Sequence, residues 1–195
     1  GDESDWVSTG IAFSWTVASS DAVVPSVVAG VVDVVGYSSY GTTVQLSLQL
    51  SADEANVYSI FGSASSPAMV LPAAYQTASG VDFGVPPAII PADAYDSWLT
   101  VGLTDGCTGA DPLCTGSEGL SSVGIDYSSW STEPLTVQDG AVLWTNPDNG
   151  ATGTAVIAQL TLGEGEYSAT VNAQGQSSGD ESDWVSTGIA FSWTV

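Results

Sequence analysis

The chain has 195 residues, of which 22 are Asp or Glu and none is Lys, Arg or His, so its formal net charge is −22. A chain without cationic side chains cannot neutralise nucleic-acid phosphates, is repelled by anionic membranes, and lacks the base of a Ser- or Cys-nucleophile triad. Because 44% of the residues are hydrophobic, we expect an apolar core beneath an acidic surface, not a disordered acidic tail.

The chain opens with a segment that it repeats at its other end. Residues 1–17 read GDESDWVSTGIAFSWTV, and residues 179–195 have the same sequence letter for letter. We call these segments the N-terminal copy and the C-terminal copy. Their alternation predicts a β-strand with one face turned to a core. The face expected to enter the core consists of Val7, Thr9, Ile11, Phe13, Trp15 and Val17, and in the C-terminal copy of Val185, Thr187, Ile189, Phe191, Trp193 and Val195.

Two identical strands in one chain would compete for one place in a sandwich core. We therefore expect one copy to complete its own domain and the other to complete a neighbour, by the strand addition that joins a peptide to a sheet edge. The neighbour is a separate subunit or an adjoining repeat of a longer polypeptide. The other interpretations are one period of a tandem array with an overlap, and a strand appended to close an open domain.

The remaining elements follow between the copies. Residues 18–25 resemble a linker, and residues 26–195 are expected to form the domain. Residues 27–35 are a β-branched run that suits a strand buried on both sides or a junction strand. Residues 42–50 alternate cleanly, with Val44, Leu46 and Leu48 turned inward. Further strands are expected at residues 56–62, 68–71, 96–104, 122–127, 141–145, 154–162, 166–174 and 184–195, with one helical turn at residues 51–56.

This pattern predicts an all-β fold, an antiparallel immunoglobulin-like β-sandwich completed by a donated terminal strand. A closed barrel is the alternative. No stretch reaches the ~18 consecutive apolar residues of a membrane-spanning helix, so no membrane insertion is expected. The chain also shows no signal peptide.

Two cysteines lie in the short sequence CTGADPLC. We expect Cys107 and Cys114 to form a disulfide, with two free thiols as the alternative. A disulfide would place the protein outside the cell. The acidic residues around this loop, Asp105, Asp111 and Glu118, are candidate calcium ligands because calcium takes oxygen ligands in Gly-rich loops. No other cofactor is expected, and acidic turns chosen for their geometry are the simpler interpretation.

Carboxylates are the remaining acid–base groups. The pairs Asp93 with Asp96, Asp126 with Glu133, and Glu164 with Glu166 could in principle support glycoside hydrolysis, but nothing singles out one of them. We therefore expect no enzymatic activity. Stacking on aromatic rings would suit a glycan partner, and the candidates are Trp98, Trp130 and Trp144. For Trp98 and Trp144, which lie in alternating strands, a place in the core is the alternative.

Several stretches are similar to a family of secreted, repeat-bearing β-domains of algae, related protists and some bacteria. They are YDSWLTVGLTDG (residues 95–106), LSSVGIDYSSW (120–130), DGAVLWTNPDNG (139–150), AVIAQLTL (155–162) and NAQGQSSGDESDW (172–184). The resemblance covers roughly residue 32 to the C-terminus and implies secretion without an assigned activity. The duplication separately resembles donor-strand-exchange pili, in which an extension of one subunit completes the fold of the next.

The sequence therefore favours a structural role. We expect a subunit or repeat of an extracellular filament or surface appendage, whose partners are identical copies joined by β-strand complementation. The alternative is a secreted calcium- or carbohydrate-binding β-sandwich module of an adhesin.

Overall fold

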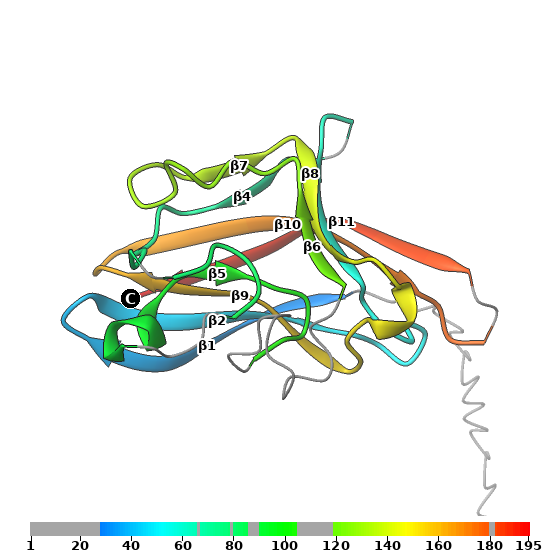
Figure 1. Cartoon of the computed structure of the whole chain (residues 1–195). Helices are drawn as coiled ribbons and strands as arrows, with labels where there is room; N and C mark the ends of the chain where they lie inside the picture. Colours follow the sequence, from blue (N-terminus) through cyan, green and yellow to red (C-terminus); the bar gives the residue numbers. More distant parts are fainter. Residues whose placement is uncertain (1–27, 66, 79, 86–89, 105–118, 180–181) are drawn as a thin grey trace, which may run out of the picture.

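The structure is a computed structural model that describes residues 28–65, 67–78, 80–85, 90–104, 119–179 and 182–195 (Figure 1). These residues form an all-β fold of antiparallel sheets, which confirms the expected β-sandwich. The strands are β1 (Ala29–Ser38), β2 (Gly41–Gln49), β3 (Ser59–Ser63), β4 (Met69–Leu71), β5 (Trp98–Leu99), β6 (Leu120–Val123), β7 (Leu135–Val137), β8 (Asp139–Trp144), β9 (Thr154–Leu162), β10 (Glu166–Gln176) and β11 (Asp183–Thr194). Two short 3₁₀ helices, η1 (Pro91–Tyr95) and η2 (Pro147–Asn149), lie between strands.

The first sheet has four strands in the order β1-β2-β9-β5. Its strand β2 shows the expected alternation, with Val44, Leu46 and Leu48 fully buried. Strand β9 pairs with β2 along almost its whole length and buries Ile157 and Leu160 against the second sheet.

The second sheet has seven strands, and β10 makes the most extensive backbone pairing in it. One edge of β10 pairs with β3 near Ala173 and with β4 at Thr170, while the other edge pairs with β11 from Glu166 to Gln176. Strand β8 pairs with β3, β6 pairs with β8, and β7 pairs with β4. We call the edge of β10 that faces β11 the acceptor edge.

Strand β1 differs from its expected place. Its β-branched sequence predicted a strand buried on both sides or a junction strand, yet β1 pairs only with β2 among the described residues and lies at the edge of its sheet. Val34 and Val35 are about half exposed, and Tyr37 is 76% exposed. The prediction was wrong because an apolar run does not show which side of a strand the neighbours cover.

The described chain enters and leaves the sandwich at opposite ends. Ala29, at the start of β1, is level with Gln49, which in turn pairs with Thr154 at the start of β9. At the other end of β9, the turn into β10 contains Gly165, whose backbone exchanges two hydrogen bonds with that of Val195. Figure 1 shows the C-terminus beside the β9–β10 turn, with the start of β1 towards the other end of the sandwich. We call the two ends the entry end and the exit end.

Candidate assembly strand

The C-terminal copy forms the last strand of the seven-stranded sheet. Nearly all of β11 pairs antiparallel with the acceptor edge of β10, from Asp183 opposite Gln176 to Thr194 opposite Glu166. The turn between the two strands is fixed to the loop after β2, because the backbone N–H of Ser178 donates to the carbonyl oxygen of Asp53 at 2.8 Å. Within the described residues β11 pairs with no further strand, so it is an edge strand.

A β-bulge divides β11 into two halves. Val171 lies opposite Ile189, but Ala173 lies opposite Ser186, so that two residues of β11 face Asn172 alone. Gly188 provides the bulge with its backbone angle, φ of +69°, which side-chain-bearing residues rarely adopt. Its N–H donates to Oδ1 of Asn172 at 2.9 Å. The amide group of Asn172 donates in turn to the carbonyl oxygens of Phe61 and Pro67.

After the bulge, β11 faces the core as the sequence predicted. Ile189 and Phe191 are buried, and Trp193 and Val195 are partly buried against the same core. The ring of Phe191 lies over Gly30 of β1, so closely that a Cβ atom built on Gly30 would lie 2.8 Å from it. Because Gly30 has no side chain, the ring of Phe191 can pack directly against β1 and cover the core between the two sheets.

Before the bulge the faces are reversed, and the prediction was wrong for two residues. Val185 is 57% exposed and Thr187 is exposed, whereas the residues that alternate with them, Trp184 and Ser186, are partly buried. The extra residue of the bulge shifts the alternation by one position, because successive side chains of a strand point to opposite faces. A lone glycine within an alternating segment is the signal that could have predicted this shift.

Trp184 holds the first half of β11 in place. Its Nε1–H donates to the carbonyl oxygen of Asn56 at 2.9 Å, and its ring covers Gly175 of β10. Next to it, the carboxylate of Asp183 accepts hydrogen bonds from the hydroxyl of Tyr58 at 3.0 Å and from the amide of Gln174 at 3.2 Å. Burial, followed by the bond to Asp183, raises the pKa of Tyr58 to about 12, so the phenol remains a donor at neutral pH.

A groove runs between the edge strands of the two sheets. It has a volume of about 260 Å³ and is lined by residues 28–30 of β1 and its approach and by residues 186–190 of β11. Val28, the first described residue, is part of this lining. The described chain therefore begins beside the C-terminal copy.

The three candidate tryptophans lie in the core. Trp98, Trp130 and Trp144 are each 4% exposed or less, and the indole N–H groups of Trp130 and Trp144 donate to the carbonyl oxygens of Pro72 and Val101 at 2.9 Å. No face of these rings is open to a sugar, so the core alternative holds for Trp98 and Trp144, and the prediction of Trp130 as a glycan-stacking residue was wrong.

Among the carboxylate pairs, the structure brings Asp93 and Asp96 together around Thr77. Both are buried; Oδ1 of Asp96 accepts the backbone N–H of Thr77 at 2.8 Å, and Oδ1 of Asp93 accepts its hydroxyl at 3.3 Å. Burial raises the pKa of Asp96 to about 6, although backbone hydrogen bonds from Thr77, Ser97 and Val81 oppose the shift. These contacts give the pair a structural role in holding the segment around Thr77 to η1.

The other two pairs lie on the surface. Asp126, Glu133, Glu164 and Glu166 are all exposed. The predicted disulfide of Cys107 and Cys114 and the candidate calcium ligands Asp105, Asp111 and Glu118 lie outside the described residues. Within the described ranges, no group of three or more Cys, Asp or Glu residues could hold a metal ion.

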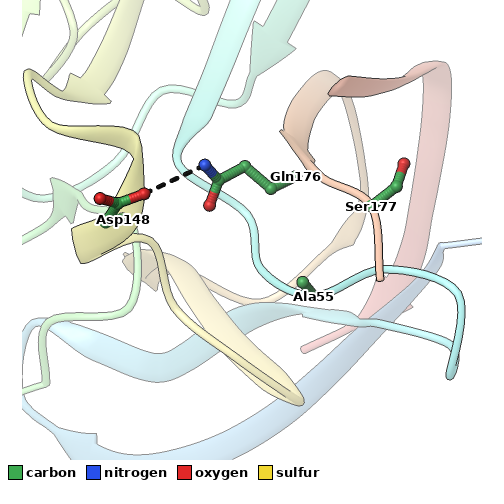
Figure 2. Close-up of a pocket in the computed structure, with 4 residues that line it drawn as sticks. All are labelled: Ala55, Asp148, Gln176 and Ser177. Carbon is green, nitrogen blue, oxygen red and sulfur yellow. Dashed lines mark hydrogen bonds between the residues drawn. The ribbon is translucent and has the colours of Figure 1, made fainter. Parts of the chain in front are cut away.

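A separate pocket of about 550 Å³ lies next to the turn between β10 and β11 (Figure 2). Its lining residues are Ala55, Asp148, Gln176 and Ser177. Nε2 of Gln176 donates to Oδ1 of Asp148 at 3.2 Å, and Oε1 of the same amide accepts the amide of Asn56 at 2.8 Å. The amide of Gln176 thus links η2 to the hairpin, which suits a structural contact.

In the part of the chain that the structure describes, no helix has the length and apolar character needed to cross a membrane. No protein-family model, curated protein or solved structure matches the chain. The strongest functional feature is therefore the segment whose sequence the chain carries twice, and whose C-terminal copy forms β11.

Proposed function

We propose that this chain is the repeating structural unit of an extracellular filament or surface appendage, in which successive units are joined by β-strand complementation. The observation that carries the proposal is the place of β11. It is a complete edge strand with buried Ile189 and Phe191, and its sequence occurs a second time at residues 1–17. Because β11 fills the acceptor edge of the described domain, we infer that the N-terminal copy belongs to the acceptor edge of another unit.

The side chains of the copy supply the stability of such a joint. Full burial of a large apolar side chain contributes about 1.5–3 kcal/mol before ordering is subtracted. Ile189 and Phe191 are almost fully buried and Trp193 is partly buried. Each of these side chains would contribute to the free energy of complementation. Backbone pairing along β10 fixes the register of the strand, and the bulge is tied to Asn172 by the hydrogen bond from the N–H of Gly188.

The net charge of −22 opposes association between units. Exposed charges are screened over about 8 Å at physiological salt, so assembly requires salt and the apolar strand together. The absence of Lys and Arg also removes every trypsin site, which suits a protein exposed outside the cell.

Two deletions test the complementation directly. A chain that lacks residues 179–195 has an open acceptor edge and retains the N-terminal copy as its only strand of this sequence. We expect it to fold and to form head-to-tail polymers or self-completed monomers, as seen by electron microscopy and size-exclusion chromatography. The matched control lacks residues 1–17, keeps β11 and is expected to remain a folded monomer.

The proposal makes the two copies interchangeable. If the chain without residues 179–195 stays unfolded at physiological salt, the N-terminal copy cannot replace β11 and complementation is refuted. A folded monomer of the natural protein that binds glycans and forms no filament would instead support the binding-module alternative.

A further inference from the structure

The number of copies of the repeated strand, compared with the number of acceptor edges, distinguishes separate subunits from a continuous polypeptide. The described domain contains one β10 and therefore one acceptor edge, whereas the chain carries two copies of the strand that fits it. Separate subunits would always have two strands for each edge, so one copy per subunit would keep its Ile, Phe and Trp side chains without a core. In a continuous polypeptide with a period of 178 residues, each edge has one strand.

From this balance we infer that the partner of the N-terminal copy is the preceding repeat of the same polypeptide, whose last strand it forms. This inference rests on the proposed function, because it names the unit that the copy completes. Residues 18–27 are then the connection from the last strand of one repeat to β1 of the next. The sequence that follows Val195 is accordingly expected to be that of residues 18–27, ASSDAVVPSV.

The outward face of β11 supports the same conclusion. Packing against the core restricts residues such as Ile189 and Phe191, but it does not restrict Val185, Ala190 or Ser192, which are exposed. A donated strand selected only for its fit would be free to differ at those positions. The two copies are identical at all of them and also in the turn that precedes the strand, as expected for copies of a whole repeat.

The ends of the domain then determine the arrangement of the repeats. The chain enters beside Gln49 and Thr154 and leaves beside Gly165, at opposite ends of β9. A strand advances about 3.3 Å per residue, so the nine residues of β9 separate the two ends by roughly 30 Å. We therefore expect consecutive repeats to follow one another end to end, an arrangement in which the ten residues 18–27 need not run back along the domain.

Peptide mapping of the natural polypeptide distinguishes the two connections. Because trypsin has no site in the chain, the protein is digested at Asp and Glu, and mass spectrometry compares two peptides. One crosses the bond between Val17 and Ala18, and the other ends at a free Val195. A tandem array gives a large excess of the crossing peptide, whereas separate subunits give equal amounts, which would overturn the inference.

The inference and the proposed function can fail independently. Equal peptide amounts from a specimen that forms filaments would refute the array and leave complementation between subunits. An excess of the crossing peptide from a specimen without filaments would refute the filament and leave the array. Small-angle scattering from a two-repeat polypeptide tests the arrangement, since side-by-side repeats would contradict the end-to-end geometry.

Discussion

Replacement of Phe191 by alanine tests the equivalence of the two copies most sharply. Phe191 is 3% exposed, lies opposite Ala169 of β10 and covers Gly30 of β1 with its ring. Neither small residue can fill the space of the ring, so the substitution leaves a cavity between the two sheets. Substitutions of a buried Phe by Ala destabilise proteins by about 3–5 kcal/mol, and we expect this full loss when no other strand can replace β11.

The N-terminal copy retains its own phenylalanine, Phe13, and under the proposed complementation we expect it to replace the damaged strand. Its connection to Val28 has ten residues, which reach up to roughly 33–36 Å when extended. Val28 lines the groove beside Ile189, and the seven residues from Ile189 to Val195 span roughly 20 Å of strand. The connection is thus long enough for the N-terminal copy to pair with the acceptor edge of its own domain.

Urea unfolding of three variants measures this exchange. Phe13→Ala alone should leave the free energy of unfolding unchanged, Phe191→Ala alone should lose only part of the 3–5 kcal/mol, and the double variant should lose all of it. Measurements at two protein concentrations separate exchange within a chain from exchange between chains, because only the latter depends on concentration. If Phe191→Ala is as unstable as the double variant, the N-terminal copy does not fill the acceptor edge and our reasoning is refuted.

Three further predictions concern the stability of the folded chain. Asp96 has a pKa of about 6 in the folded chain and a usual value of 3.8, so the native state holds more protons and stability should fall by ~3 kcal/mol as pH rises from about 4 to about 6. Asp96→Asn should flatten that dependence in urea titrations, and an unchanged slope would contradict it. Gly188→Ala, at φ of +69°, should destabilise the chain by roughly 1–2 kcal/mol, in contrast to an exposed Ser192→Ala control. Gly30→Val should displace the ring of Phe191 and cost about 1–3 kcal/mol in thermal unfolding, and a neutral result would exclude the close packing.

The fold class could be predicted because alternation survives wherever one face of a strand is buried. In β2 the inward residues Val44, Leu46 and Leu48 are fully buried, as their spacing indicated. Strand β5 was overestimated, since only Trp98 and Leu99 pair within the expected residues 96–104. After Leu99 the backbone N–H groups of Thr100 and Gly102 still donate to the carbonyl oxygens of Ile157 and Val156 of β9, but the regular ladder ends at Leu99 although Val101 stays buried.

Some elements had no usable signal in the sequence. Strand β7 has three residues, too few for a period of two to stand out, and its pairing with β4 depends on a distant segment. Asp93 and Asp96 were recognised as a pair of carboxylates, but their burial around Thr77 depends on how η1 packs. The candidate strand itself was identified from its repetition, and only its bulge was missed.

The bulge in β11 also bears on the proposed assembly, because it limits the pairing of a further strand with the exposed edge of β11. Edge strands are usually protected by Lys, Pro, inward-pointing charges or bulges, and this chain has no Lys. In β11 the two residues opposite Asn172 break the regular spacing of backbone groups, and Gly188 turns the strand locally. A further strand would therefore pair poorly beyond β11, whereas the acceptor edge of β10 fits the copy and its bulge. The proposed assembly would then complete one edge per unit, without unlimited stacking of identical strands.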